Sequence, residues 1–479
     1  GMRTALRLIS VLLFLGVLFL TAAPPASAQD TNSNATLTGA WSAEESYFRP
    51  VIRFEQSANR SLVAFLAGTA RQKGTPFSKT RLRGDSLFLQ SDRMGARFRG
   101  TVSTERQVIK GTWRQGDRSA TLTLTPVQNT DSRQTASTAP PRPQHPDRPY
   151  PYRTEEVTFR SDADGITLAG TLSLPDDEGP HPAVVLLPGS GENDRDYAYR
   201  GHKFFLVLAD YLTRRGIAVL RYDQRGVGES EGRLSGASLE DLARDAASAL
   251  RFVKERPSTE TSSVGLIGHS MGGMIAPWIH DQFQEAAFLA LLAPPSLPGH
   301  QVLSQQQARL ADAAGASPAE VDSIRERTHR VFEILRSDRD SADVASQLRP
   351  IYREGGARND PLRLRVEANT SGWFRDLARY DPRPTLRKVD VPILVVFGDR
   401  DLAVPPQQNA APMRAALDSS PSDHVSVRVL EGLNHLMQPT KAEWAGDAAE
   451  VDTTLSPEIL EQLTGWIQER AGFKEKGLR

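Results

Sequence analysis

The sequence predicts an α/β protein whose main sheet is mostly parallel, preceded by a small all-β domain. Three observations carry this prediction. Between positions 36 and 127, short runs of alternating hydrophobicity recur about every ten residues, which is typical of an antiparallel meander. A proline-rich segment follows at 128–152. Beyond it, short apolar runs alternate with helical stretches, the pattern of a parallel sheet covered by helices on both faces.

Composition narrows the function classes before any motif is considered. The chain has 479 residues, with 58 basic and 58 acidic side chains and no cysteine. Without cysteine, a disulfide framework, a thiolate metal site, an iron–sulfur cluster and a cysteine nucleophile are all excluded. Because nucleic-acid binding needs an excess of Lys and Arg, overall neutrality argues against a nucleic-acid partner. Nothing in the composition indicates the oligomeric state.

Residues 1–28 have the pattern of a secretory signal peptide. Arg3 and Arg7 precede the apolar run 8–20, and small residues of an A-x-A site end at Ala28. The alternative is an uncleaved membrane anchor, but the prolines at 24–25 favour cleavage. We therefore expect a periplasmic or secreted protein. Membrane contact is expected only through this segment, before it is removed.

The first folded domain is expected at 36–127. Its strand-like runs are bounded by turn residues such as Asn59-Arg60 and Arg83-Gly84-Asp85, which favours a barrel or a sandwich. We find no cluster of ionisable residues there that resembles a catalytic site. The linker at 128–152 cannot bury a core, and we expect it to act as a semi-extended spacer.

The larger domain is expected at 153–472. Ser238 and Asp241 form a capping-box pattern at the start of a predicted helix over 239–256, and a second helix is predicted over 203–215. The predicted strands, several of them continuous Val/Ile/Leu runs suited to burial on both faces, lie at 157–160, 167–174, 183–187, 217–222, 264–268, 288–292, 393–397 and 425–430.

A long insertion at about 296–387 separates the sixth and seventh of these strands. Its helical segments, such as 318–336 and 361–368, carry charged faces. Ordered insertions of this size beside a parallel sheet are usually functional. We expect a helical cap.

The sequence Gly268-His269-Ser270-Met271-Gly272 fits the pattern G-x-S-x-G. It follows a predicted strand and precedes a stretch that is compatible with a helix. A sharp strand–turn–helix connection of this kind exposes a nucleophilic serine above the sheet, and the glycines let the backbone pass closely through the turn. The alternative is a tight turn whose serine only caps a helix.

A serine nucleophile needs a base, and His435 is the best placed of nine histidines. In hydrolases with this elbow the chain order is serine, acid and then a histidine after the last strand, which is the position of His435. His269 is adjacent to Ser270 and poorly placed to reach its hydroxyl. The remaining histidines lie in the linker, before the serine, in the following helix, in the cap or at the start of the last strand.

Two aspartates after the seventh predicted strand compete for the role of the acid. Asp401 begins a D-x-x-V-P stretch that often carries the acid, whereas Asp399 lies closer to the strand. We favour Asp401 and expect Asp399 to hold the loop through turn hydrogen bonds. The acid would orient the imidazole and stabilise its charged form without taking up a proton.

An oxyanion hole requires two backbone N–H groups aimed at the developing negative charge. The amide of Met271, directly after the serine, is one candidate. The loop after the third predicted strand supplies the other, with Ser190 preferred and Gly191 second. Pro188 stands where many such loops have histidine, which removes a stiffening side chain but leaves the backbone donors intact.

Residues 153–472 resemble an α/β-hydrolase, most closely the bacterial secreted carboxylesterases that follow a small β-domain. The resemblance rests on residues 188–196, 221–230, the elbow at Ser270, and 398–405 together with Asn434-His435. Trp373-Phe374-Arg375 with Tyr380-Asp381-Pro382 also resembles the junction between cap and sheet in that group. The resemblance implies an eight-stranded, mostly parallel sheet with helices on both faces and a helical cap insertion.

The resemblance also implies ester hydrolysis through an acyl-enzyme, with no metal or organic cofactor. Trp373 and Phe374 are candidates for lining an acyl pocket, although aromatic residues under a cap are more often packing residues. Residues 194–196 either contact polar groups of a substrate or pair with one another. Asp223, Arg225 and Ser230 are expected to brace the loop after the fourth strand.

We therefore expect a serine carboxylesterase acting on small to medium acyl esters, a small-molecule substrate class. Thioesterase and lactonase activity stay open, because the sequence does not identify the substrate. A peptidase of the prolyl-oligopeptidase type shares the triad order, but its propeller would not fit the small β-domain. A non-catalytic protein that binds cell-wall glycan or lipid is the alternative from another class.

Overall fold

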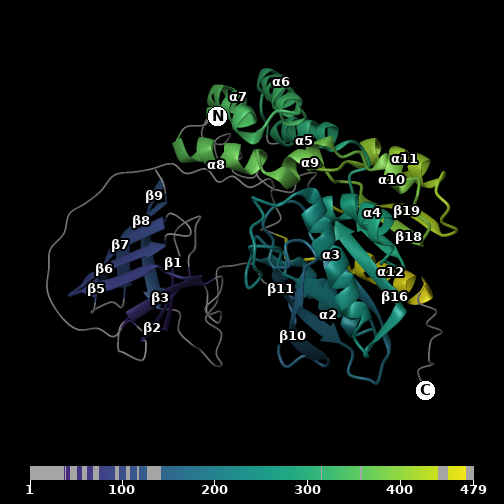
Figure 1. The fold of residues 1–479 in the computed structure, drawn as a ribbon, viewed down its shortest axis with the longest axis horizontal. Helices are drawn as coiled ribbons and strands as arrows, with labels where there is room; N and C mark the ends of the chain where they lie inside the picture. The colour runs from purple at the N-terminus through teal and green to yellow at the C-terminus, as the bar shows by residue number, and fades with distance from the viewer. Residues whose placement is uncertain are drawn as a thin grey trace. The chain divides into compact units, whose positions relative to one another are not determined.

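The computed structural model describes residues 37, 39–43, 51–56, 62–67, 75–91, 96–103, 108–115, 118–126, 142–313, 315–356, 359–440 and 451–470. These residues form two compact units, one from the strands before residue 127 and one from most of the chain after residue 142 (Figure 1). Each unit is considered by itself. The expected signal segment lies outside the described residues. Among the residues that the structure describes, no helix has the length and apolar character needed to cross a membrane.

The first unit is one antiparallel sheet, in agreement with the predicted all-β domain. Ala64 N–H donates to Thr80 Oγ1 (3.1 Å), so the strand that ends at residue 67 approaches the one that begins at 79, as in a barrel. The buried side chains, among them Phe54, Phe98 and Trp113, share the inner face. The strands, adjacent in the order β4-β3-β2-β1-β9-β8-β7-β6-β5, are β1 Gly39–Ala43, β2 Val51–Gln56, β3 Leu62–Ala67, β4 Thr75–Pro76, β5 Lys79–Arg83, β6 Ser86–Ser91, β7 Ala96–Ser103, β8 Val108–Gln115 and β9 Arg118–Pro126.

The second unit contains the predicted eight-stranded sheet, and all eight predicted strands are present. The order along the sheet is β10-β11-β15-β12-β16-β17-β18-β19. Strand β11 runs antiparallel to both of its neighbours, and the other pairs are parallel. The strands are β10 Arg153–Arg160, β11 Thr167–Leu174, β12 His181–Leu187, β15 Ala218–Tyr222, β16 Thr259–His269, β17 Leu289–Leu292, β18 Ile393–Gly398 and β19 Val425–Leu430. A separate two-stranded ribbon pairs β13 Ala198–Tyr199 with β14 His202–Lys203.

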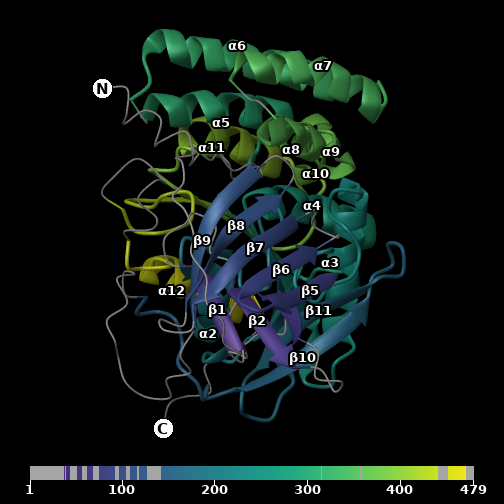
Figure 2. The same ribbon diagram turned by 90° about the vertical axis from the view of Figure 1, so that its left-hand side faces the viewer.

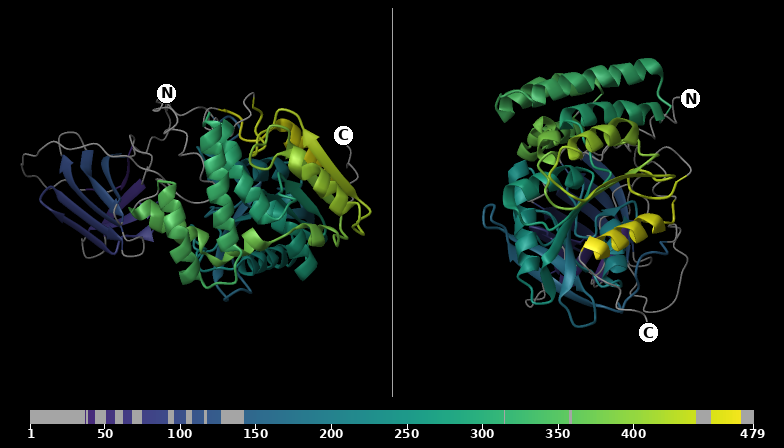
Figure 3. Two further views of the ribbon diagram at one scale, coloured as in Figure 1. Left: turned by 90° about the horizontal axis from the view of Figure 1, so that it is seen from above. Right: turned by 90° about the vertical axis from the view of Figure 1, so that its right-hand side faces the viewer.

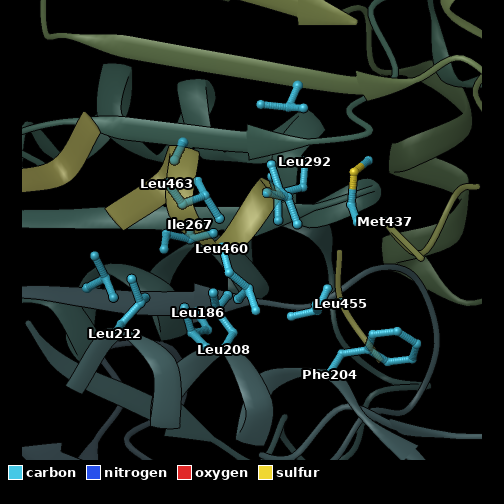
Figure 4. Packing of buried hydrophobic residues seen from close by; sticks show 14 of the residues in the cluster. Leu186, Phe204, Leu208, Leu212, Ile267, Leu292, Met437, Leu455, Leu460 and Leu463 are labelled. Carbon is cyan, nitrogen blue, oxygen red and sulfur yellow. The ribbon is translucent and has the colours of Figure 1, made fainter. Parts of the chain in front are cut away.

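Helices cover both faces of this sheet, as expected for strands that are apolar on both sides. Helix α2 (Phe204–Thr213) packs with α12 (Pro457–Arg470) on one face, and α3 (Leu239–Lys254) packs with α4 (Met271–Phe283) on the other (Figure 3). Helix α11 (Pro406–Leu417) follows β18. Figure 4 shows the core between the sheet and α2 and α12, where labelled side chains such as Leu186, Ile267 and Leu463 interdigitate.

The capping box predicted for α3 is confirmed. The Ser238 hydroxyl accepts from Asp241 N–H (3.0 Å), and the Asp241 carboxylate accepts from Ser238 N–H (2.8 Å). This reciprocal pair satisfies two N–H groups that the first turn of a helix otherwise leaves without partners. The start of α3 is thereby fixed beside the loop that follows β15.

Buried polar contacts brace that loop, as expected. Arg225 forms a bidentate pair with Asp245 of α3 (2.7 and 2.8 Å), and both side chains are buried. The Ser230 hydroxyl donates to the Asp223 carbonyl (2.6 Å). The Asp223 carboxylate accepts from Arg195, both at the backbone N–H (2.8 Å) and at the guanidinium (2.7 Å). The structure therefore gives the motif of residues 221–230 a positioning role.

The predicted cap is a group of helices inserted between β17 and β18 (Figures 1 and 2). The buried guanidinium of Arg375 donates to the carbonyls of Leu335 (3.3 Å) and Ser337 (2.8 Å), which joins two of these helices. A short helix, α10 (Arg383–Leu386), then leads back to the sheet. The cap helices are α5 Gly299–Ala313, α6 Pro318–Leu335, α7 Ser341–Glu354, α8 Asn359–Asn369 and α9 Gly372–Arg379.

The second half of the predicted spacer is attached to the second unit. The side-chain amide of Gln144 donates to the Leu455 carbonyl (2.7 Å) and accepts from the N–H groups of Thr454 (2.6 Å) and Leu455 (2.9 Å). The Tyr152 hydroxyl donates to Asp210 (3.0 Å). A proline-rich segment has no core of its own, but these side chains bond it to an existing surface. Residues 128–141 lie outside the described residues.

Candidate active site

The elbow predicted at Ser270 is present and has an unusual backbone conformation. Ser270 has φ 53° and ψ −118°, between the end of β16 at His269 and the start of α4 at Met271. A Cβ on Gly272 would lie 2.4 Å from the Leu187 carbonyl oxygen. A Cβ on Gly268 would lie 2.5 Å from the backbone of Gly272. Only glycine fits at these two positions, which explains the pattern G-x-S-x-G in steric terms.

Three side chains from three strand ends meet at this elbow. His435 Nε2 lies 3.0 Å from Ser270 Oγ, and His435 Nδ1 lies 2.8 Å from Asp401 Oδ2. Because the carboxylate can only accept, Nδ1 carries the proton and Nε2 accepts from the serine hydroxyl. The Asp401 carboxylate also accepts from Val404 N–H (2.7 Å) and is 1% exposed as a residue. The arrangement can deprotonate the serine hydroxyl as it attacks.

The structure separates the two competing aspartates. Asp401 contacts His435, whereas Asp399 Oδ1 accepts from Gly432 N–H (2.6 Å). The Asp399 contact joins the loop after β18 to the loop after β19. This is the turn-holding role that the sequence favours for Asp399.

The loop that carries His435 is held by a buried amide pair that the sequence reading missed. Asn434 Oδ1 accepts from the N–H groups of Leu436 (2.9 Å) and Gln438 (3.0 Å), and Asn434 Nδ2 donates to Gln438 Oε1 (3.1 Å). Gln438 Nε2 in turn lies 3.1 Å from His202 Nε2. Asn434 and Gln438 are both fully buried. The backbone of His435 is therefore fixed from both sides.

The oxyanion candidates differ in their placement. Met271 and Ser190 line the same cavity as Ser270 and His435, whereas Gly191 does not belong to its lining. Met271 opens helix α4, where backbone N–H groups have no acceptor within the helix. Asn193 stiffens the loop of Ser190, because its Nδ2 donates to the carbonyls of Gly189 (3.0 Å) and Gly191 (3.1 Å).

A small cavity that opens to solvent begins at Ser270. Apart from the catalytic candidates and Gln306, its walls are apolar or small, and they come from α4, α5, α9 and the loops after β17 and β18. The lining residues are Ser190, Ser270, Met271, Met274, Pro295, Gly299, Val302, Leu303, Gln306, Leu377, Val404 and His435. Such a site can receive an apolar group next to the serine.

The two aromatic pocket candidates do not belong to this lining. Trp373 and Phe374 are 7% and 3% exposed and lie at the start of α9. Their rings pack against each other (5.5 Å between centroids), and Phe374 also packs against Phe332 of α6 (6.2 Å). The structure thus places them in the core of the cap, while Leu377, one helical turn further along α9, reaches the cavity.

Residues 194–196, the other substrate-contact candidates, are engaged within the protein. Arg195 pairs with Asp223 and with Glu229 (2.8 Å), and Asp196 pairs with Lys203 (3.0 Å) and Arg221. Arg195 and Asp196 are therefore paired within the protein, but with residues of other segments and not with each other as the pairing alternative expected. Within the described part of the chain, no group of three or more His, Asp or Glu side chains is placed to hold a metal ion.

Comparison with known families decides the classification of the chain. The model of the family described as serine aminopeptidase, S33, matches residues 179–439, more than half of the sequence. The chain belongs to this family. The matched segment includes Ser270, Asp401 and His435, and the larger unit has the α/β-hydrolase fold that the sequence predicts.

Individual relatives of this S33-family chain include proteins with different activities in their names. Esterase EstD of Thermotoga maritima is 30% identical over 270 residues, which are 56% of this chain and 58% of that protein. The chain therefore spans less than two thirds of this relative. The proline iminopeptidase of Lactobacillus delbrueckii subsp. lactis is 25% identical over 236 residues, covering 47% of this chain and 76% of that protein. Among solved structures, an α/β hydrolase from Penicillium, GrgF, aligns over 67% of this chain and 100% of its own with 18% identity and a TM-score of 0.43.

In this S33-family site, a buried hydrogen-bond chain connects the loop of Gly189 and Ser190 to the backbone of His435. His269 Nε2 lies 2.8 Å from the His435 carbonyl oxygen, which can only accept, so Nε2 carries the proton. His269 Nδ1 then accepts from the Tyr197 hydroxyl (3.0 Å), and the Tyr197 oxygen accepts from Gly189 N–H (3.2 Å). Burial, reinforced by His435 nearby, lowers the pKa of His269 to about 3. His269 is thus a neutral positioning residue, in agreement with its exclusion as the base.

The cap is also connected to the loop of Asp401, the candidate acid. Arg309 of α5 donates to the carbonyls of Leu402 (3.1 Å) and Ala403 (3.2 Å), directly after Asp401. The same helix lines the cavity through Val302 and Leu303. The helix that shapes the cavity therefore also fixes the backbone beside the acid.

We predict that Asp401→Asn and Asp399→Asn separate the two aspartates in function. Asp401→Asn replaces the acceptor of the His435 Nδ1 proton, so reaction of Ser270 with a fluorophosphonate probe is expected to slow by on the order of ten thousandfold. Asp399→Asn keeps an acceptor for Gly432 N–H and is expected to change this rate only severalfold. Equal losses in the two variants would contradict the placement of the acid.

We also predict an acid-sensitive stability that originates at His269. Its pKa falls from the ordinary value of 6.5 to about 3 on folding, so between these pH values the unfolded chain binds a proton that the folded protein does not. The free energy of unfolding therefore decreases as the pH falls below 6.5. Over two pH units this one group accounts for about 2.7 kcal/mol.

The effect is measured as the difference in the free energy of unfolding in urea at two pH values that lie two units apart between 6.5 and about 3. His269→Gln removes the imidazole that titrates at this position, so the decrease in stability between the two pH values is expected to be smaller than in the wild type by about 2.7 kcal/mol. His329→Gln on α6 is the matched control, because the His329 side chain is 71% exposed. The same acid sensitivity in His269→Gln as in the wild type would contradict the buried neutral state.

Proposed function

We propose that this chain is a serine esterase that hydrolyses small to medium acyl esters through an acyl-enzyme at Ser270. One observation carries the proposal: Ser270 Oγ is hydrogen-bonded to His435, which is bonded to the buried Asp401, beside an apolar cavity. The name of the EstD relative supports the same activity.

In the acylation step, Ser270 Oγ attacks the ester carbonyl carbon while its proton passes to His435 Nε2. The carbonyl oxygen becomes negatively charged, and the N–H groups of Met271 and Ser190 would stabilise it. Asp401 stabilises the imidazolium through the hydrogen bond at Nδ1. When the tetrahedral intermediate collapses, the carbon–oxygen bond to the alcohol breaks, and His435 gives its proton to that alcohol.

Deacylation repeats these steps with water as the nucleophile. Water attacks the acyl carbon and loses a proton to His435 Nε2, and the same backbone N–H groups stabilise the second oxyanion. The bond to Ser270 Oγ then breaks, Oγ recovers the proton, and the carboxylic acid is released. The reaction needs no redox step, because only acyl and proton transfers occur.

The cavity supports an apolar acyl group as the substrate feature. The cavity walls include the apolar side chains of Met274, Val302, Leu303 and Leu377, and Gln306 is the one amide among the lining residues. An apolar acyl group that covers these side chains removes apolar surface from water, which stabilises its binding. Because two cap helices and the loops at the sheet edge form the walls, the acyl group would have to fit into the space beneath the cap. Thioesters and lactones with an apolar acyl part would fit the same walls.

A peptidase is the second candidate, because the family description names a serine aminopeptidase and one relative is a proline iminopeptidase. An aminopeptidase must hold the charged amino group of its substrate close to the scissile bond, and an acidic side chain is the usual partner of such a charge. Among the described residues that line the cavity there is no Asp or Glu. This favours neutral esters over peptides with a free amino end.

We predict that Ser270→Ala abolishes hydrolysis of p-nitrophenyl esters, because the acyl-enzyme cannot form. The expected loss of kcat is on the order of a millionfold. Ser304→Ala on α5 serves as the matched control and is expected to keep both turnover and labelling by a fluorophosphonate. Activity that does not depend on Ser270 would overturn the proposal, and comparable cleavage of acyl amides would favour the peptidase.

We further propose that the protein is exported to the periplasm or the medium. The positive start, the apolar run and the small-residue site in residues 1–28 support this proposal. Expression of the full chain is expected to give an exported product whose intact mass is that of residues 29–479. A cell-associated product of full mass would favour the uncleaved anchor.

A further inference from the structure

The outer face of the first unit carries a group of basic side chains on strands β5, β7 and β8, with β6 between β5 and β7. We call this group the basic face: Lys79, Arg81, Arg83, Arg97, Arg99, Lys110 and Arg114. All seven are exposed, whereas the neighbouring side chains of Leu82, Phe98, Ile109 and Trp113 pack in or against the apolar core. Figure 2 shows the four strands side by side.

The register of the sheet arranges these charges in rows that cross the strands. In the first row Lys79 pairs with Gln90, which pairs with Arg97, which pairs with Arg114. The second row contains Arg81 and Arg99 on either side of Phe88, and the third contains Arg83 and Lys110. Strands lie about 4.8 Å apart, and alternate residues along a strand lie about 6.8 Å apart, so the face covers about 14 by 14 Å.

Acidic side chains do not neutralise this face in the described part of the unit. Between residues 75 and 115, Asp85 is the only acid among the described residues, and it lies in the turn between β5 and β6. None of the seven basic residues has an ion-pair partner among the described residues. The Arg99 guanidinium lies 5.4 Å from the centroid of the Phe88 ring, which holds this charge flat against the sheet.

The sequence confirms that charge is segregated between the two units. Residues 36–127 contain 15 basic and 7 acidic side chains, whereas the rest of the chain contains 43 and 51. The overall neutrality therefore averages a strongly basic first unit with an acidic remainder. A concentrated positive face of this kind costs self-repulsion and is suited to a negatively charged partner.

We propose that the basic face docks on the surface of an anionic lipid bilayer. The charges extend in two dimensions over four strands, which matches a planar array of lipid headgroups better than a single polymer chain. Five of the seven are arginines, whose guanidinium groups bind phosphate oxygens in a bidentate manner. Hydroxyl side chains lie between them and can donate further hydrogen bonds: Ser86, Thr101 and Thr112.

Such docking would give the first unit a role that is independent of the chemistry at Ser270. It would bring the chain to a surface where apolar acyl esters are concentrated, and the apolar cavity would accept them. The expectation that the membrane is contacted only through the signal segment is then revised. Whole-chain neutrality hides this face, because the face arises from side-chain alternation in four paired strands.

Co-sedimentation of the mature chain with vesicles tests the proposal. The wild type is expected to bind vesicles of equimolar phosphatidylcholine and phosphatidylglycerol, to bind pure phosphatidylcholine weakly, and to dissociate in high salt. The triple variant Arg81→Gln, Arg99→Gln, Arg114→Gln is expected to bind the anionic vesicles about a hundredfold more weakly. Its hydrolysis of a soluble ester and its tryptophan fluorescence are expected to be unchanged, which shows that it is folded.

A matched control removes the same number of charges from the other unit: Arg153→Gln, Arg233→Gln, Arg349→Gln, three exposed positions. It is expected to bind anionic vesicles as the wild type does. Equal weakening in both triple variants, equal binding to both kinds of vesicle, or no binding at all would overturn the proposal. Tight, salt-sensitive binding to soluble heparin without vesicle binding would also overturn it in favour of a polymer partner. Because vesicle binding is measured without turnover, a failed esterase assay leaves this test intact.

Discussion

The backbone at Ser270 is the constraint on which the active site depends. A serine at φ 53° and ψ −118° lies in a sparsely populated region that costs about 1–3 kcal/mol. It persists because its neighbours determine it: Ser270 N–H donates to the Leu292 carbonyl (2.9 Å), and Met274 N–H donates to the Ser270 carbonyl (2.9 Å). Gly272 packs directly against the end of β12. The central strands of the sheet thus hold the serine in a position that the peptide would not adopt alone.

The partners of Ser270 reach it because parallel strands end at the same edge of the sheet. Asp401 follows β18 and His435 follows β19, and the parallel register of these strands places both loops at that edge. The loops are then fixed to one another through Asp399 and Gly432, to the cap through Arg309, and to the oxyanion loop through Tyr197 and His269. These supports hold the loops where the hydrogen bonds from His435 to Ser270 and to Asp401 can form.

Local order in the sequence predicted the parts of this site that are local. The strand–turn–helix pattern indicated Ser270, and the residues around Asp401 distinguished it from Asp399. The supports could not be found in this way, because their partners are distant: 72 residues separate Tyr197 from His269, 166 separate His269 from His435, and 93 separate Arg309 from Leu402. Such contacts depend on how helices and loops pack, which no short pattern records.

The sequence also could not show whether the aromatic residues of α9 line the cavity or pack in the core of the cap. Trp373, Phe374 and Leu377 lie within two turns of one helix, and only the leucine reaches the cavity. Which face of α9 turns inward is decided by Phe332 on a neighbouring helix and by the buried guanidinium of Arg375, both fixed by tertiary packing. The prediction of a cap made of inserted helices was therefore correct, but only the structure shows which residues form the interior of the cap.

The two units show opposite relations between sequence and surface chemistry. In the larger unit, charged residues of the motifs after β12 and β15 form ion pairs within the unit. The charged segment 194–196 therefore has a structural role. In the smaller unit, unremarkable alternating residues become a continuous basic face once four strands pair in register. A charge that is internally paired is not available to a partner, whereas a repeated charge without an internal partner is available to another surface. That difference, rather than the total charge of the chain, is what points to a membrane-facing role for the first unit.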